Sequence, residues 1–219
     1  MFENNFFNSL EEKLCNIATI NKQPIGGSLE LLPLCNMNCD MCYVRLRPEE
    51  AERKGGICSG KRWLTLAEEM KRNGVLFLLL TGGEPFLHPN FQEIYLGLFQ
   101  RGMILSINTN GTLITEELAA FLGKYRPRRV NVTLYGGTNE TYAKLCHNPN
   151  GLTQTLNGIR LLQKYNIDVK LNGSLVRGNC KDLDEIICIS RDLGLYLKID
   201  TYMYPATRER DGGFCDASR

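Results

Sequence analysis

The sequence predicts an α/β protein built as a partial (β/α)6 TIM-type barrel with a parallel sheet, and three observations lead to this fold class. Short apolar runs alternate with longer amphipathic segments from residue 29 to residue 202, which is the pattern of repeated strand–helix units. The apolar runs carry few charges, as strands buried on both faces of a parallel sheet require. Six such units are too few for a closed eight-stranded barrel, which typically needs about 250 residues.

The expected strands are rich in Leu, Ile and Val. They cover residues 28–32, 75–81, 103–108, 129–134, 168–174 and 196–202. Little sequence follows the sixth strand, and it contains Pro205, Gly212 and Gly213. We therefore expect the last helix to be missing and the chain to end in an irregular tail.

Capping residues mark where the helices between these strands begin and end. Thr65, followed by Glu68 three residues later, has the form of a capping box, and Gly74 is typical of a helix C-terminus. Thr115 and Asp182 precede acidic residues and indicate comparable helix starts. The expected helices run over residues 65–73, 91–101, 116–125, 152–165 and 183–193.

Charge and hydropathy exclude several classes of partner. Lys and Arg number 26 against 24 Asp and Glu, and the resulting formal charge of +2 is too small to indicate nucleic-acid binding. The first residues lack the basic and apolar regions of a secretory signal. The longest purely apolar run, residues 75–80, is far shorter than the roughly 20 residues that span a bilayer. We expect a cytoplasmic protein with neither a nucleic-acid nor a membrane partner.

Three of the nine cysteines, Cys35, Cys39 and Cys42, fall within eight residues directly after the first expected strand. Residues that follow a strand lie at the carboxyl edge of a parallel sheet, which is where such sheets bind ligands. Thiolates select zinc, copper(I) or iron–sulfur clusters, and a structural zinc site usually takes four ligands. No fourth Cys or His has matching spacing, so the triad indicates a metal site with an open position. The alternative is that these cysteines are simply buried or bind zinc.

A second motif follows the second expected strand, where Gly82 and Gly83 precede Glu84 and Pro85. Glycines let a ligand approach the backbone closely, and the Glu84 carboxylate is an acceptor suited to an ammonium group. A lone Gly-Gly-Glu-Pro is more often a tight turn. Its position after the second strand, together with the cysteine triad, favours a binding site.

The CxxxCxxC triad and the Thr-Gly-Gly-Glu-Pro stretch at residues 81–85 together resemble the radical S-adenosylmethionine (SAM) superfamily. The resemblance extends over residues 28–204, and it implies a core domain there, an N-terminal extension over residues 1–27 and a tail over residues 205–219. It further implies that Cys35, Cys39 and Cys42 each bind one iron of a [4Fe-4S] cluster, whose fourth iron takes the amino and carboxylate groups of SAM. One electron, from a flavodoxin- or ferredoxin-like donor, would split SAM into methionine and a 5'-deoxyadenosyl radical that removes hydrogen from a substrate.

The same resemblance nominates further residues for the SAM pocket. It implies that residues 82–84 hold the methionine amino group, and Asn108 begins an Asn-Thr-Asn-Gly stretch similar to one that faces the site in relatives, although Asn-Gly is also an ordinary turn signal. Thr133 offers a hydroxyl to the ribose where relatives often have Ser. Relatives often place an Arg near Cys146 for the SAM carboxylate; lacking one there, this chain has Arg177 as a candidate, or as a solvated loop charge.

Residues 131–179 are most similar to radical enzymes that modify peptides or proteins and usually carry a C-terminal SPASM or twitch module. Such a module needs a further group of cysteines after the barrel, and only Cys215 is present. The chain is therefore expected to be a fragment, a minimal enzyme or half of a split enzyme, with a peptide or protein substrate. Two alternatives stay open, which are a non-catalytic cluster- or SAM-binding module and a radical enzyme that acts on a small molecule.

Overall fold

A parallel sheet of six strands forms the centre of the computed structural model, which describes residues 3–202, with side chains from residue 10 onward. The strands are β1 (Gly26–Glu30), β2 (Phe77–Thr81), β3 (Ile104–Thr109), β4 (Arg129–Leu134), β5 (Val169–Ser174) and β6 (Leu197–Asp200). They pair in chain order, and every pair is parallel. All six carboxyl ends therefore lie at one edge of the sheet, and the predicted partial barrel is confirmed.

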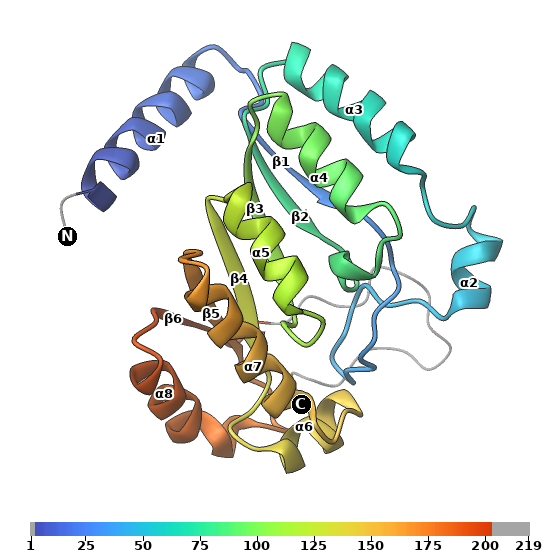
Figure 1. The fold of residues 1–219 in the computed structure, drawn as a ribbon, viewed down its shortest axis with the longest axis vertical. Helices are drawn as coiled ribbons and strands as arrows, with labels where there is room; N and C mark the ends of the chain where they lie inside the picture. The colour runs from blue at the N-terminus through green and yellow to red at the C-terminus, as the bar shows by residue number, and fades with distance from the viewer. Residues whose placement is uncertain (1–2, 203–219) are drawn as a thin grey trace.

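Helices follow one another along one side of the curved sheet (Figure 1). They are α3 (Gly60–Arg72), α4 (Phe91–Gln100), α5 (Glu116–Lys124), α7 (Gly151–Lys164) and α8 (Leu183–Asp192). Each of the five expected helices is present, with bounds shifted by a few residues. The tail predicted over residues 205–219 lies outside the described residues.

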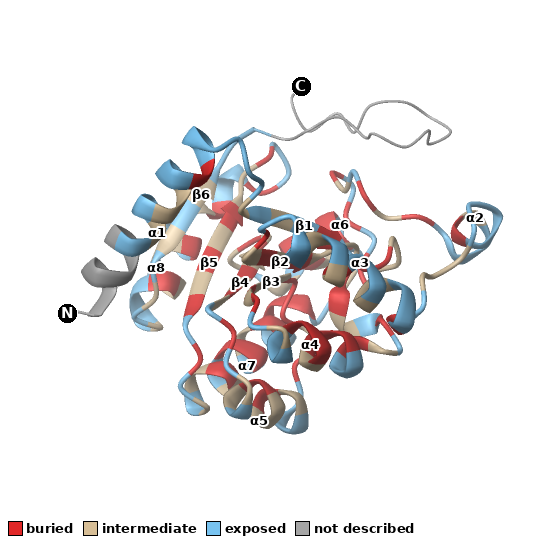
Figure 2. Ribbon diagram, turned by 90° about the horizontal axis from the view of Figure 1, so that it is seen from above, coloured by how far each residue is buried: buried red, intermediate tan, exposed pale blue. Residues whose placement is uncertain are grey.

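The strands are buried on one face only. Alternate residues pack against the helices with almost no exposed surface, namely Leu78, Leu80, Leu105, Ile107, Val130, Val132 and Leu134. Figure 2 shows buried stretches on the strands and on the helices that pack beside them. The residues between them are half-buried and mostly polar in the later strands, for example Ser106, Asn108, Asn131, Thr133 and Ser174. The prediction of strands buried on both faces is wrong, because a partial barrel leaves its inner face open.

Helix α3 begins earlier than the capping pattern predicted. Ser59 is the residue before the helix, and its hydroxyl accepts a hydrogen bond from the backbone N–H of Arg62 at 3.4 Å. Thr65 lies inside the helix, where its hydroxyl donates to the carbonyl of Lys61 at 3.0 Å. Ser and Thr can bond in this way to the preceding helical turn, so a Thr-x-x-Glu pattern is compatible with a helix interior.

The other two predicted helix starts differ from each other. Thr115 caps α5 as expected, since its hydroxyl accepts the N–H of Leu118 at 3.2 Å. Asp182 does precede α8, but its carboxylate makes no capping bond to that helix. It accepts instead the N–H of Gly137 at 2.9 Å and thereby ties the loop after β4 to the start of α8.

Three α-helices were not expected from the sequence: α1 (Glu3–Ile20), α2 (Pro48–Arg53) and α6 (Asn139–Cys146). Helix α2 lies within the long charged connection between β1 and α3. Helix α1 stands beside the amino ends of the strands (Figure 1), where Leu10 and Leu14 help to line a cavity of about 410 Å³. Glu11 on α1 forms an ion pair with Arg128 there. None of the helices described over residues 3–202 is long and apolar enough to cross a bilayer.

Candidate functional site

A cavity of about 200 Å³ opens at the carboxyl edge of the sheet. The loop that follows β1 forms one side of it, and the ends of β2, β3, β4 and β5 form the other. Seven of the predicted site residues line it together, namely Cys35, Cys39, Cys42, Gly82, Gly83, Asn108 and Thr133. The structure thus gathers residues that are up to about a hundred positions apart in the chain.

The loop that carries the three cysteines is closed by its own backbone. The N–H of Leu46 donates to the carbonyl of Pro33 at 2.9 Å. Within the loop, the sulfur of Cys35 accepts the N–H of Met37 at 3.4 Å, and the sulfur of Cys42 accepts the N–H of Arg45 at 3.3 Å. Backbone N–H groups aimed at sulfur favour the thiolate form that a metal requires.

Burial opposes the thiolate form when no cation is bound. Burial raises the pKa of Cys35 to about 12, although the N–H of Met37 lowers it. The pKa of Cys39 is raised still further, first by its hydrogen bond with Cys146 and then by burial. A bound metal ion inverts this preference because it takes the place of the proton.

The middle of the cysteine loop is attached to the end of α6. The N–H of Asn38 donates to the carbonyl of Cys146 at 3.1 Å, and the N–H of Asp40 donates to the carbonyl of Leu145 at 3.0 Å. The Asp40 carboxylate lies 2.7 Å from the His147 ring at the end of the same helix. The backbone on both sides of Cys39 is therefore held by a helix that the sequence did not indicate.

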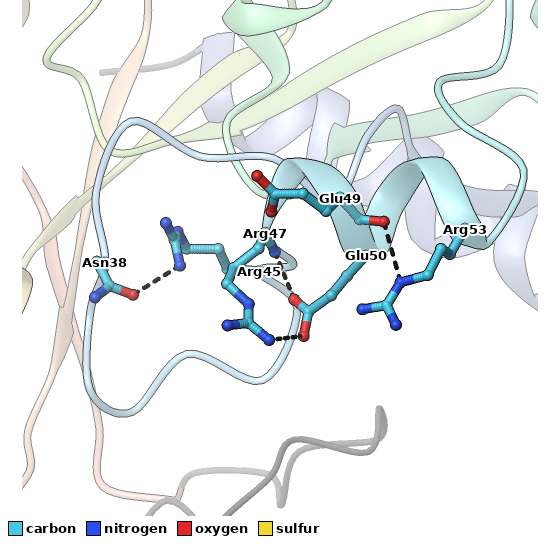
Figure 3. Close-up of polar contacts among 6 residues, drawn as sticks. All are labelled: Asn38, Arg45, Arg47, Glu49, Glu50 and Arg53. Atoms are coloured by element: carbon cyan, nitrogen blue, oxygen red, sulfur yellow. Dashed lines mark hydrogen bonds and ion pairs between the residues drawn. The ribbon is translucent and has the colours of Figure 1, made fainter.

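Polar contacts also hold the segment that leaves the cysteine loop (Figure 3). Arg45 reaches back to the side-chain oxygen of Asn38 at 2.8 Å. The Glu50 carboxylate accepts both the backbone N–H of Arg47 at 2.7 Å and its guanidinium at 3.0 Å, which starts α2. The hydrogen bond from the Arg47 guanidinium is the main reason that the pKa of Glu50 falls to about 2.

Gly82 and Gly83 lie against the segment that leads into the cysteine loop. A Cβ atom on Gly83 would stand 2.1 Å from the carbonyl oxygen of Leu34, and one on Gly82 would stand 2.5 Å from that of Leu32. The N–H of Gly83 donates to the Leu32 carbonyl at 2.8 Å, and the N–H of Glu84 donates to the Leu34 carbonyl at 2.9 Å. The fold therefore requires both glycines, before any ligand is considered.

The Glu84 side chain is fully buried and does not line the cavity. Its carboxylate accepts the hydroxyl of Thr109 at 2.9 Å and the backbone N–H groups of Asn110 and Phe86 at 2.9 and 3.2 Å. Burial raises the pKa of Glu84 to about 7, and these three donors oppose the rise. The carboxylate thus joins the end of β2 to the end of β3 beneath the cavity.

Removing the Glu84 carboxylate is expected to destabilise the protein. In Glu84→Ala the buried N–H of Asn110 loses its acceptor, which costs about 1–3 kcal/mol in the free energy of unfolding. Urea denaturation of the cluster-free protein, followed by circular dichroism, measures this loss. Glu69→Ala, which removes an exposed carboxylate on α3, is the matched control, and equal midpoints for the two variants would contradict the structural role of Glu84.

The end of β3 contacts the cysteine loop directly. The amide nitrogen of Asn110 lies 2.9 Å from the side-chain oxygen of Asn36 and 3.7 Å from the sulfur of Cys35. Asn108 lines the cavity two residues earlier, and its side-chain oxygen accepts a hydrogen bond from the Asn131 amide at 2.8 Å. The sequence nominated Asn108 but not Thr109 or Asn110, although all three belong to the same Asn-Thr-Asn-Gly stretch.

Other predicted and unpredicted residues complete the description of the site. Arg177 is exposed in the loop after β5 and is not part of the cavity lining. Tyr135 and Ser174 do line the cavity, as do Met37 and Met41 of the cysteine loop. Their positions at the end of a strand, directly after a strand or among the cysteines were a usable signal. Among the described residues that line the cavity, none is Lys, Arg or His.

The three thiols form a donor set that fits an iron–sulfur cluster. Among the side chains that the structure describes, those of residues 10–202, no three from His, Cys, Asp or Glu gather closely enough to hold one metal ion. Each thiolate of a [4Fe-4S] cluster binds a different iron, so its cysteines stand around the cluster and not around one point. Three buried or half-buried sulfurs facing one cavity, with two of them accepting backbone N–H groups, match that requirement.

Comparisons with known proteins find a matching family model and similar sequences. Residues 29–187 match the family model described as the radical SAM superfamily. AlbA of Bacillus subtilis strain 168, an antilisterial bacteriocin subtilosin biosynthesis protein, is 30% identical over 172 residues, which are 78% of this chain and 38% of AlbA. SkfB of the same organism, a sporulation killing factor maturation protein, is 24% identical over 177 residues, which are 80% of this chain and 41% of SkfB. The chain spans about two fifths of the length of these relatives.

Solved structures show the same fold. SuiB from Streptococcus suis superposes with a TM-score of 0.71 at 16% identity, covering 98% of this chain and 48% of SuiB. The structure of SuiB bound to precursor peptide SuiA superposes with a TM-score of 0.68 at 14% identity, covering 86% of this chain and 42% of SuiB. At such low identity the likeness concerns the fold alone.

Proposed function

This chain belongs to the radical SAM superfamily, and from that premise we propose that it binds a [4Fe-4S] cluster through Cys35, Cys39 and Cys42 and cleaves SAM reductively to modify a peptide or protein. When bound and reduced, the cluster supplies the electron that splits SAM into methionine and a 5'-deoxyadenosyl radical, which abstracts hydrogen from the substrate. The reductant belongs to the flavodoxin or ferredoxin class.

One observation carries this proposal: three thiols and the Gly-Gly turn face the same cavity at the carboxyl edge of the sheet. The cysteines and the turn come from different strand–helix units, so only the parallel fold brings them together. An electron carrier would need the thiols alone. The additional polar lining from β3, β4 and β5 supports a second ligand beside the cluster.

Several groups of this chain are suited to bind that second ligand or to position the residues that do. The hydroxyls of Thr133 and Ser174 and the amide of Asn108 line the cavity and suit the polar groups of a nucleoside and an amino acid. Gly82 and Gly83 present backbone at the cavity wall. Glu84 acts indirectly, because its carboxylate positions the end of β3 through Thr109 and Asn110.

A peptide or protein substrate is favoured by the relatives. AlbA and SkfB are named for the biosynthesis of a bacteriocin and the maturation of a killing factor, and SuiB has been solved with a precursor peptide. The cavity of this chain lies at the carboxyl edge of the sheet, which is where a peptide substrate would have to reach it.

Cleavage of SAM tests the proposal directly. We expect the anaerobically reconstituted and reduced protein to convert SAM into 5'-deoxyadenosine and methionine, measured by liquid chromatography. Samples without reductant, and the Cys35→Ala variant, are expected to form neither product. A fully loaded cluster that never yields 5'-deoxyadenosine would contradict an enzyme and favour a cluster- or SAM-binding module.

A further inference from the structure

Asn179 lies in the loop after β5, where its side chain is fully buried and is not part of the cavity lining. Its amide nitrogen donates one hydrogen bond to the carbonyl of Tyr135 and one to the carbonyl of Ser174, each at 2.8 Å. Its side-chain oxygen accepts the backbone N–H of Val176 at 2.7 Å. Both N–H groups of the amide and its oxygen are therefore used.

The two carbonyls lie where the hydrogen-bonded ladder between β4 and β5 ends. Leu134 and Gly173 are the last residues that pair across these strands. Tyr135 and Ser174 each follow by one residue. By taking both of their carbonyls, the amide of Asn179 connects the two strand ends one step beyond the ladder. A single side chain thus fixes the separation of these strand ends.

Both of the residues that Asn179 connects line the cavity of the proposed site. Each side chain is attached to the backbone that the amide holds, so the bridge determines how the Tyr135 and Ser174 side chains stand relative to each other. Binding sites depend on supporting hydrogen bonds of this kind, because small displacements of the contacting residues weaken binding. Asn179 therefore acts on the site without touching a ligand.

A second contact from the same loop supports the bridge. Asp182 is also buried, and its carboxylate accepts the N–H of Gly137, two residues after Tyr135. The N–H of Asp182 donates to the carbonyl of Asn179 at 2.9 Å. A Cβ atom on Gly137 would stand 2.3 Å from the Cβ of Glu185, so the loop after β4 also packs closely against α8. Asn179 holds the lining residues themselves, whereas Asp182 holds the loop that follows them.

We propose that Asn179 is a positioning residue of the SAM pocket, whose amide holds Tyr135 and Ser174 in the arrangement that binds SAM. This inference rests on the proposed function. Arg177, which the sequence nominated in this loop, is exposed two residues earlier. The contribution of the loop to the pocket comes instead from a buried amide that acts through the backbone of two other residues.

Substitution of Asn179 separates this role from a general loss of stability. Wild type and Asn179→Ala are reconstituted to equal iron content and titrated with SAM, and the electron paramagnetic resonance (EPR) signal of the reduced cluster gives the half-saturating concentration. We expect Asn179→Ala to raise that concentration about tenfold, because the hydrogen bonds that hold the two strand ends are lost.

Ser190→Ala is the matched control for a lost buried hydrogen bond. The Ser190 hydroxyl is buried on α8 and donates at 2.8 Å to the carbonyl of Leu195, which precedes β6 at the opposite edge of the sheet. We expect this variant to denature at a lower urea concentration than wild type and still to give the wild-type half-saturating concentration of SAM.

Hydrogen exchange of the cluster-free protein gives a second readout that requires neither iron nor SAM. Peptides that cover residues 135–137 and 174–180 should exchange faster in Asn179→Ala than in wild type, because the Val176 N–H loses its acceptor and the bridge is gone. The same peptides should exchange at wild-type rates in Ser190→Ala. If Asn179→Ala does not fold, Asn179→Asp keeps the acceptor for Val176 without the two donors and carries the same expectation for SAM.

Several outcomes would overturn the inference. A half-saturating concentration for Asn179→Ala within about twofold of the wild-type value would remove the positioning role, and unchanged hydrogen exchange would remove the bridge itself. Equal weakening in Ser190→Ala would show that any loss of stability weakens SAM binding. In these cases the wild type still responds to SAM and the proposed function stands. A wild-type cluster whose EPR signal SAM leaves unchanged would overturn the proposed function together with this inference.

Discussion

Replacing Cys35, Cys39 and Cys42 together by Ala is expected to lower the iron bound after anaerobic reconstitution from about four per chain to background, since one [4Fe-4S] cluster uses all three thiolates. The three sulfurs line the same cavity, and two of them accept backbone N–H groups there. Alanine supplies no ligand atom, so no partial site is left. Iron analysis and the visible absorbance of the cluster, which bleaches on reduction, measure the loss.

A matched triple variant controls for the number of cysteines removed. Cys58, Cys180 and Cys188 are free thiols that lie outside the lining of the cavity. Replacing these three by Ala should leave both the iron content and the bleaching response at wild-type values. Loss of iron from this control variant, or substantially more iron than one cluster holds in the wild type, would contradict the assignment of the cluster to the triad.

Gly83→Val is expected to lower the stability of the protein and its iron content together. A Cβ at position 83 meets the backbone carbonyl of Leu34 at 2.1 Å, and backbone cannot rotate away as a flexible side chain does. That carbonyl also accepts the N–H of Glu84 and directly precedes Cys35. Overpacking of this kind costs about 1–3 kcal/mol or more, and the displaced segment carries the first proposed ligand. Urea denaturation of the cluster-free protein and iron analysis after reconstitution measure the two effects.

Gly26→Val is the control for the added side chain. Gly26 lies at the start of β1, and the nearest atom to a Cβ there is 3.8 Å away, which is ordinary contact. We expect this variant to denature near the wild-type midpoint and to bind a full complement of iron. If Gly83→Val behaved in the same way, the close contact between the Gly-Gly turn and the cysteine loop would not be a constraint on the site.

Much of the fold could be predicted because its signals are local. All six strands and their parallel association follow from short apolar runs separated by amphipathic ones, and Thr115 marks the start of α5 by a side chain that bonds three residues away. Helices α1, α2 and α6 were not predicted, because each is short or has a weak apolar pattern. The capping pattern at Thr65 predicted the wrong start for α3, because the same residues are compatible with a helix interior.

Features whose causes lie within a few residues or at strand ends could be predicted from the sequence. The cysteine triad is compact, and Asn108 and Thr133 could be placed beside it because parallel strands end at one edge of the sheet. The tertiary structure decided everything that depends on contacts between distant segments. Glu84 faces the end of β3 and not the cavity, Arg177 lies outside the lining, and the backbone on both sides of Cys39 bonds to the end of α6. Such contacts follow from how α6 and the strand ends pack around the sheet, and residue spacing along the chain carries no record of that packing.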